Sequence, residues 1–224
     1  MIISRRYTLM LAAATGAVSL AGLGSAYAQD AAVAIDPATL MKLDPAGLTD
    51  HVLGNKAAKV TVIEYGSAGC PHCGAFHKDV YPAFKTKYID TGKIAFVYRP
   101  FALNVYDVAV FMLAEIAGPD HFYNVIDTFY DNQDKWDFAE SDPGNAGKEG
   151  DAIQAIALQL GFTADSYKQG LTNQEWPTRI QKARDQAVND FKVSGTPTFY
   201  INGKQMVGEQ TLDDLSKAID PLLA

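Results

Sequence analysis

The chain contains two cysteines, Cys70 and Cys73, and both lie in the segment GSAGCPHCGAF, residues 66–76. A disulfide between them closes a very short loop, which constrains the unfolded chain by about 2 kcal/mol, against about 3 kcal/mol for a loop of fifteen residues. Such a bond is a weak structural clamp. The spacing therefore favours a redox pair whose disulfide forms and breaks during function.

The residues around this pair predict a helix that begins at Cys70. Pro71 suits the first helical position, where its missing N–H costs nothing, and apolar residues recur at every fourth position, namely Phe76, Val80, Phe84 and Tyr88. A thiolate at a helix start faces unpaired N–H groups and the positive end of the helix dipole. We therefore expect Cys70 to be the nucleophile and Cys73, one turn further along, to be the shielded resolving thiol.

His72 lies between the two cysteines, where an imidazolium would favour the Cys70 thiolate further. A stabilised thiolate stabilises the reduced pair, so the disulfide form accepts electrons readily. Such a protein would oxidise the thiols of other proteins.

Other uses of a C-x-x-C pair fit this chain less well. A zinc site needs further ligands, but the sequence has no other cysteine, and the spacing of His72 and His77 fits no familiar four-ligand set. Covalent haem requires a histidine directly after the second cysteine, and Gly74 stands there. We expect no metal and no cofactor; a purely structural bridge is a minor alternative.

Glu64 is a candidate buried acid. The segment KVTVIEY, residues 59–65, is β-branched and apolar on both faces, which is typical of a strand buried in a sheet. Glu64 alternates with Val60 and Val62, so it would share their face, and a carboxyl group buried there can hold or pass a proton. The pattern alone leaves equal room for a glutamate that faces solvent at the strand end.

Thr196 and Pro197 form a second candidate site. Pro197 stands between a predicted helix and a predicted strand, where a cis peptide bond would be a deliberate feature, although local sequence alone favours an ordinary trans bond. A cis bond would leave the backbone groups of Thr196 free to pair with an extended substrate segment.

The composition and the first residues indicate the class and the compartment. The formal net charge of the 224 residues is −7, which argues against a nucleic-acid partner. Residues 1–28 read as a signal peptide, with Arg5 and Arg6 before an uncharged stretch that ends in Ala26-Tyr27-Ala28; a membrane anchor is the alternative. SRRYTL partly matches a twin-arginine signal, so the export route stays open. Either route leads out of the cytoplasm, into an oxidising compartment in which disulfides persist.

The order of predicted elements indicates an α/β fold. A strand at 59–65, a helix from 70 and a strand at 93–99 form a βαβ unit, which implies a parallel pair, and Pro82 should kink the helix. Helices are predicted at 106–118, 120–132, 151–161 and 175–192, then strands at 198–201 and 204–207 around an Asn202-Gly203 turn, and a last helix from 212. We expect one sheet with helices on both faces and a helical insertion between its halves.

Two segments together resemble the DsbA-type thiol:disulfide oxidoreductases of the bacterial envelope. GNKAAKVTVIEYGSAGCPHCGAF is similar to their active-site segment, and VSGTPTFYINGK to their cis-proline segment. The resemblance, which spans about residues 51–224, implies a thioredoxin fold with an inserted helical domain. The expected division is a signal peptide at 1–28, an N-terminal arm at 29–55, a thioredoxin domain at 56–100 and 183–224, and helices at 101–182.

The resemblance also implies roles and partners. It makes Cys70 the nucleophile and Cys73 the resolving thiol, and it implies that Pro71, His72 and Glu64 tune the redox pair. It also places Thr196 and Pro197 at the substrate-binding position, with the bond before Pro197 in cis. The implied partners are exported proteins with free cysteines and a quinone-linked membrane oxidase. The expected arm is short for a trimerising stalk, which favours a monomer in the periplasm.

One residue departs from the pattern of this family. Many DsbA-type oxidases carry valine before the cis-proline, and Thr196 stands there; threonine is more usual in isomerase or reductase relatives. A disulfide isomerase or reductase that a membrane donor keeps reduced is therefore the alternative function. A non-catalytic holdase or thiol-based binding protein is a rival of another class.

Overall fold

The computed structural model describes residues 33–137 and 147–224. The expected signal peptide, residues 1–28, lies outside the described residues. The elements in chain order are α1 (Pro37–Leu40), β1 (Val52–Gly54), β2 (Val60–Gly66), α2 (Pro71–Ala75), η1 (Phe76–Val80), α3 (Tyr81–Phe84), η2 (Lys85–Ile89), β3 (Ile94–Pro100), α4 (Val105–Ala117), α5 (Phe122–Asp131), α6 (Gln133–Trp136), α7 (Glu149–Gln159), α8 (Ala164–Leu171), α9 (Glu175–Asn189), β4 (Thr198–Ile201), β5 (Lys204–Val207) and α10 (Leu212–Leu223). Within these two ranges, no helix combines the length and apolarity needed to cross a bilayer.

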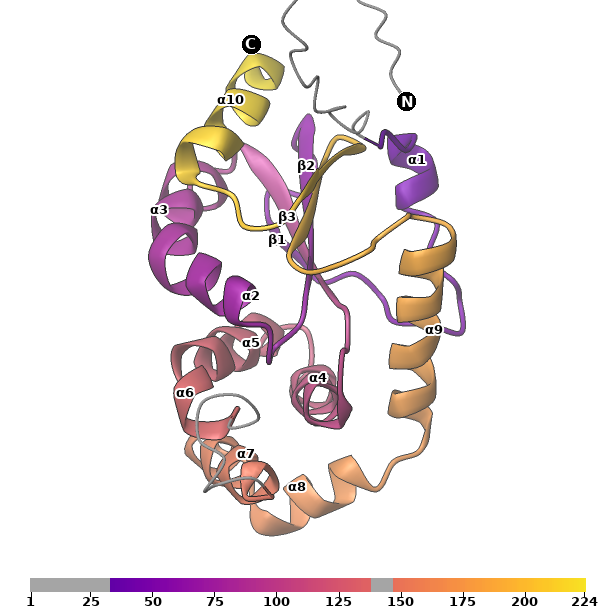
Figure 1. Ribbon diagram of the computed structural model, residues 1–224, viewed down its shortest axis with the longest axis vertical. Coiled ribbons are helices and arrows are strands. Elements are labelled where there is room, and N and C mark those ends of the chain that lie inside the picture. The colour runs from indigo at the N-terminus through magenta and orange to yellow at the C-terminus, as the bar shows by residue number, and fades with distance from the viewer. Residues whose placement is uncertain (1–32, 138–146) are drawn as a thin grey trace, which may run out of the picture. The chain divides into compact units, whose positions relative to one another are not determined.

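Five strands form one sheet in the order β1-β3-β2-β4-β5 (Figure 1). The strands β2 and β3 run parallel, and the other neighbours run antiparallel. The β4–β5 hairpin turns at Asn202 and Gly203, whose φ values of 45° and 87° are the left-handed conformations that a two-residue type I′ turn requires. The βαβ start and the Asn-Gly hairpin are both confirmed.

Alternation along β2 divides its side chains between two cores. One face carries Val60 and Val62 into the larger core, together with side chains of the helices that follow β2 and of α10, namely Phe76, Phe84, Leu215 and Ile219. The other face carries Ile63 and Tyr65 toward α1 and α9, and Figure 1 shows these two helices on one side of the sheet and α2, α3 and α10 on the other. Glu64 is fully buried on the face of Val60 and Val62, as the alternation predicts.

The helical run from Pro71 to Ile89 is not a regular α-helix. The π-helical turns η1 and η2 alternate with α2 and α3. Pro82 lies in the first turn of α3, directly after η1, and its ring nitrogen has no hydrogen to give to the preceding turn. The expected disturbance at Pro82 therefore takes the form of a widened helical turn before it.

The described residues between β3 and β4 form the helices α4 to α9. Helix α5 packs against α4 on one side and against α2 and η1 on the other, so this helical block reaches the segment that carries the cysteines. The expected boundary between helical insertion and C-terminal strands, residues 182–183, falls inside α9. The long helix thus belongs to both parts of the chain and leads from the block back to the sheet (Figure 1).

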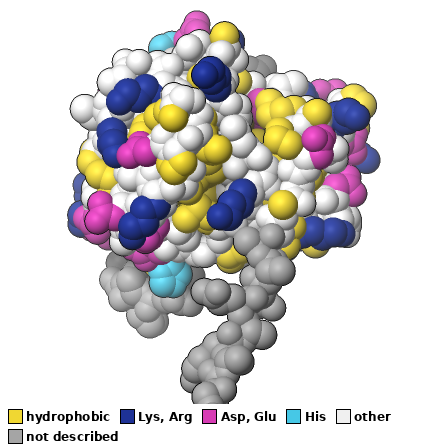
Figure 2. Space-filling view, turned by 90° about the horizontal axis from the view of Figure 1, so that it is seen from above, with side chains coloured by type: hydrophobic (Ala, Val, Ile, Leu, Met, Phe, Trp, Pro, Cys, Tyr) yellow, Lys and Arg dark blue, Asp and Glu magenta, His cyan; other side chains and the backbone are white. Residues whose placement is uncertain are grey.

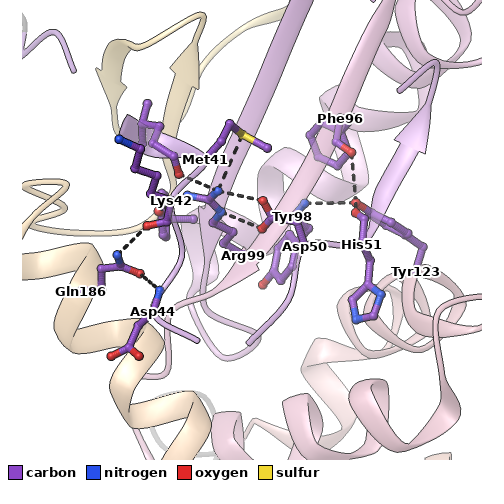
Figure 3. Close-up of polar contacts among 12 residues, drawn as sticks. Met41, Lys42, Asp44, Asp50, His51, Phe96, Tyr98, Arg99, Tyr123 and Gln186 are labelled. Atoms are coloured by element: carbon purple, nitrogen blue, oxygen red, sulfur yellow. Dashed lines mark hydrogen bonds and ion pairs between the residues drawn. The ribbon is translucent and has the colours of Figure 1, made fainter. Parts of the chain in front are cut away.

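A buried arginine fastens the segment before β2 to the sheet (Figure 3). Arg99 of β3 donates from Nε and Nη2 to the two carboxylate oxygens of Asp50, each at 2.8 Å. Its Nη1 donates to the Tyr65 hydroxyl at 2.6 Å, and Nη2 also donates to the Leu40 carbonyl at 2.9 Å. Side chain–backbone hydrogen bonds of Gln186 and Tyr123 hold the same segment at Lys42, Asp44 and His51. Residues 40–51, which we expected within an arm, are therefore anchored at several points.

Charged side chains of both signs are interspersed on the face that Figure 2 shows. Lysine and arginine do not gather there into the continuous basic patch that nucleic-acid binding requires. This distribution agrees with the net charge of −7.

Replacing Asp50 by alanine should destabilise the fold by about 3 kcal/mol, because it leaves the Arg99 charge buried without its partner. Urea unfolding of the two proteins measures the difference. Lys217→Ala, which breaks the exposed ion pair with Asp214, is the control and should leave the free energy of unfolding nearly unchanged. Equal effects of the two substitutions would contradict the role of the buried pair.

Candidate active site

Cys70 is the N-cap of α2 and follows the C-terminal end of the central strand β2. It has an extended backbone conformation, and Pro71 occupies the first helical position, as predicted. The backbone N–H of Gly74 donates to the Cys70 carbonyl at 3.0 Å, which closes the first helical turn. Cys70 is 7% exposed, whereas Cys73 is 0% exposed. One sulfur is thus near the surface and the other is enclosed.

The Cys70 thiol is strongly acidified, with its pKa lowered to about 5. The largest cause is the hydrogen bond that the Cys73 thiol donates to a Cys70 thiolate, and the Thr196 side chain and the backbone N–H groups of Cys73 and His72 add further donors. Burial opposes them. So does the Thr196 carbonyl, 3.4 Å from Cys70 Sγ, because it can only accept from a protonated thiol. The helix start contributes as expected, but the neighbouring thiol contributes more.

Cys73 behaves in the opposite way. Burial raises its pKa well above that of an ordinary thiol, and the hydrogen bond with Cys70 and the charge of Glu64 raise it further. The pair therefore loses one proton and keeps the other, so that at neutral pH the negative charge sits on Cys70. This is the difference between nucleophile and resolving thiol that the spacing led us to expect.

Thr196 and Pro197 lie directly against the nucleophile. Their peptide bond is cis, as the resemblance implied, and the Thr196 carbonyl is the group in contact with Cys70 Sγ. The Pro197 carbonyl accepts a hydrogen bond from the backbone N–H of Gly208 at 2.8 Å. The structure thus brings a segment more than a hundred residues away in the chain against the helix start.

His72 contacts the site differently from our expectation. Its backbone N–H stabilises the Cys70 thiolate, but its imidazole is exposed, and Nδ1 lies 3.4 Å from a carboxylate oxygen of Glu209. Glu209 follows β5, and nothing in the local sequence marked it.

Gln133 of the helical block holds the turn that carries Cys70. Its Nε2 donates to the carbonyls of Ala68 and Cys70 at 2.6 and 3.0 Å. A Cβ on Gly74 would come within 2.2 Å of the Gln133 side-chain oxygen. Glycine after the second cysteine therefore does more than exclude haem attachment, because it leaves the space that Gln133 occupies.

Asp107 joins the loops on two sides of the site. This fully buried carboxylate accepts from the Ser67 hydroxyl at 2.7 Å, from the Gly69 N–H at 2.7 Å and from the Leu103 N–H at 2.8 Å. Burial raises its pKa, while these donors oppose the rise. Only the Asn104–Asp107 pattern at the start of α4, a helix cap followed by an acid in the first turn, could have drawn attention to it.

Glu64 lies near Cys73 and is paired with His77. The His77 Nε2 atom is 3.1 and 3.2 Å from the two carboxylate oxygens. We considered His77 only as a metal ligand, but it follows Cys73 by four positions, which places both side chains on one face of the helical run. Within residues 33–137 and 147–224, no group of three or more side chains is arranged to hold a metal ion.

The chain is similar to proteins of known family and structure. The model of the thioredoxin family matches residues 47–221. A relative from Rickettsia felis, named as a protein-disulfide oxidoreductase, is 35% identical over 178 residues, which cover 78% of this chain and 60% of that relative. The crystal structure of alpha-DsbA1 from Wolbachia pipientis is 26% identical, with a TM-score of 0.74, over 84% of this chain and 96% of that chain.

These matches confirm the thioredoxin fold that the resemblance implied. The disulfide bond formation protein D of Bacillus subtilis is a further relative, 26% identical over 75% of each chain. The matched part of this chain spans 60% of the length of the Rickettsia felis relative.

Removing the Cys73 thiol should raise the pKa of Cys70 from about 5, because the largest stabilising donor is lost. The ultraviolet absorbance of the thiolate, followed against pH, measures this pKa. Cys73→Ser is the matched control, since its hydroxyl can still donate, and its midpoint should stay nearer that of the unmodified protein than the midpoint of Cys73→Ala does. Midpoints that stay near 5 in both variants would show that the Thr196 side chain and the backbone N–H groups acidify Cys70 without the Cys73 thiol.

Proposed function

The chain belongs to the thioredoxin family, in its DsbA-type branch of thiol:disulfide oxidoreductases, and on this premise we propose that it oxidises the cysteines of exported proteins. The observation that carries the proposal is the acidified Cys70 beside a fully buried Cys73. In the oxidised form, these two residues hold the disulfide that the protein donates.

The exchange proceeds in two steps. A substrate thiolate attacks Cys70 Sγ, the Cys70–Cys73 bond breaks, and the electron pair leaves with Cys73, which takes up a proton. A second substrate thiolate then attacks the substrate sulfur of the mixed disulfide and expels Cys70. A thiolate with a low pKa is a good leaving group, so the second step releases an oxidised substrate and a reduced protein.

The acidity of Cys70 sets the direction of this exchange. The Cys70 thiolate exists only in the reduced protein, so stabilising it favours reduction of the disulfide. Each unit by which the Cys70 pKa lies below the ambient pH raises the reduction potential by about 30 mV. Because the pKa of Cys70 is lowered to about 5, this stabilisation is complete above the ordinary cysteine pKa of about 8.5. It declines as the pH falls and is lost below about 5.

The proposed location is the periplasm, supported by the signal-like residues 1–28. An oxidase there must be reoxidised after each turnover, and we assign that step to a quinone-linked membrane oxidase. Thr196 and Pro197 lie beside Cys70, so the substrate segment would bind along them. The exposed side chains of Leu103, in the loop that Asp107 joins to Gly69, and of Val105, at the start of α4, offer an apolar contact nearby. The protein would act as a monomer.

Thr196 favours a second candidate function. Its side chain is among the groups that stabilise the Cys70 thiolate. Threonine before the cis-proline is also the residue that is more usual in isomerase and reductase relatives. In that case a membrane donor of electrons would keep the pair reduced, and Cys70 would attack wrongly paired disulfides of substrates.

Cys70→Ser should abolish both the oxidation of a dithiol peptide and the reduction of insulin. Serine cannot form the disulfide that is donated, and its hydroxyl is not ionised at neutral pH to act as a nucleophile. Cys73→Ser retains the nucleophile and should accumulate a mixed disulfide with substrate instead, visible on a non-reducing gel. Activity of Cys70→Ser in both assays would refute the assignment of the nucleophile.

The redox state in the cell separates the two candidate functions. Trapping of free thiols in the periplasmic pool should find the Cys70–Cys73 pair mostly as a disulfide if the protein is an oxidase. The purified protein should also oxidise reduced ribonuclease but fail to restore activity to scrambled ribonuclease. A pool of dithiol together with rescue of the scrambled enzyme would establish the isomerase instead.

A further inference from the structure

The resolving thiol has no direct route to solvent for the proton that it must take up. Cys73 and Glu64 are both 0% exposed. Glu64 is near enough to Cys73 for its charge to raise the pKa of that thiol, so its carboxyl group is placed to exchange a proton with the leaving sulfur. Glu64 must itself be resupplied from somewhere after each turnover.

His77 connects Glu64 with the molecular surface. Its Nε2 contacts the Glu64 carboxylate at 3.1 Å, and its Nδ1 lies 3.8 Å from Oδ1 of Asp127 on α5. Nδ1 and Oδ1 are both buried and have no hydrogen-bond partner of their own. Asp127 lines a surface cleft and its side chain is 37% exposed. A small rotation of either side chain would close the remaining gap.

The other groups that face His77 leave the two carboxyls as the proton carriers. Tyr130 stacks on the imidazole with ring centroids 4.0 Å apart, and Tyr81 and Tyr98 pack against it. Burial raises the pKa of all three tyrosines, so they stay neutral near pH 7. Lys85 and Asp131 line the same cleft as His77, Tyr81 and Asp127.

Asp127 is suited to the outer position of such a path. Burial raises its pKa to about 6, the His77 charge opposes this rise, and the charges of Asp131 and Glu64 add to it. A carboxyl group that titrates near neutral pH can both take a proton from water and give it up.

We propose that His77 relays protons between Asp127 at the surface cleft and Glu64 next to Cys73 during disulfide exchange. The inference rests on the proposed function, because it supplies the proton that the exchange consumes. It assigns positioning and proton-transfer roles to two residues outside the cysteine motif.

The transfer balances as follows. When the Cys70–Cys73 bond breaks, the Cys73 thiolate takes a proton from the Glu64 carboxyl group as that group accepts one from His77 Nε2. Nδ1 of the same ring accepts a proton from Asp127, and Asp127 is reprotonated by water. The net change is one proton moved from solvent to Cys73, and the same path returns it when the pair is reoxidised.

The test compares His77→Gln and Asp127→Asn with the unmodified protein. Glutamine can still donate a hydrogen bond to Glu64 but cannot relay a proton. We expect the rate constant for reduction of the disulfide form by a cysteine peptide to fall about tenfold at pH 7. This is less than the 10²–10⁴-fold of a fully removed acid, because Glu64 remains. Asp127→Asn should also remove the inflection of this rate near pH 6.

Asp131→Asn is the matched control, since it removes a carboxylate from the same cleft. It should keep the rate and an inflection, moved to lower pH because the Asp131 charge no longer raises the pKa of Asp127. The Cys70 midpoint near pH 5 should be unchanged in all variants. An active unmodified protein whose Asp127→Asn form keeps the rate and the inflection would overturn the relay and leave the proposed function intact. An equal loss in Asp131→Asn would overturn it too, by assigning the effect to the cleft charge. An unmodified protein without any thiol exchange would refute the proposed function instead.

Discussion

The hydrogen bond between the two thiols is the interaction on which the chemistry of this site depends. Two adjacent sulfurs share one proton, and the fold decides which of them holds it by enclosing Cys73 completely and leaving Cys70 near the surface. Because burial raises the pKa of Cys73 well above that of an ordinary thiol, its S–H remains available at neutral pH as a donor to Cys70. The strand that ends before the site, the proline at the helix start and the cis-proline segment all serve to keep this asymmetry.

Local sequence predicted the parts of the site that follow from chain spacing. The position of Cys70 at a helix start needs only Pro71 and the apolar period after it, and the burial of Glu64 needs only its alternation with Val60 and Val62. The same holds for the parallel βαβ unit and the Asn202-Gly203 hairpin. The cis bond at Pro197 did not follow from local sequence and was expected only by resemblance.

The residues that sequence reasoning missed act across long separations in the chain. Gln133 reaches the Cys70 carbonyl from the helical block, Asp107 bonds to a loop forty residues earlier, and Arg99 anchors Asp50. No periodicity encodes such pairs, since each depends on how distant elements pack. His77 is the intermediate case, because its spacing from Cys73 was visible but its partner on β2 was not.

The bond from Gln133 to the carbonyls of Ala68 and Cys70 has a consequence for protein engineering. A minimal scaffold made by excising the helices and rejoining the strands would remove the Gln133 donor from the Ala68 and Cys70 carbonyls, leaving the Cys70 carbonyl with the Gly74 N–H. It would also leave the space beside Gly74 empty. The helical insertion therefore supplies contacts that hold the turn carrying Cys70 in its conformation. Grafting residues 70–73 alone onto another fold would transfer the two cysteines without the contacts from Gln133.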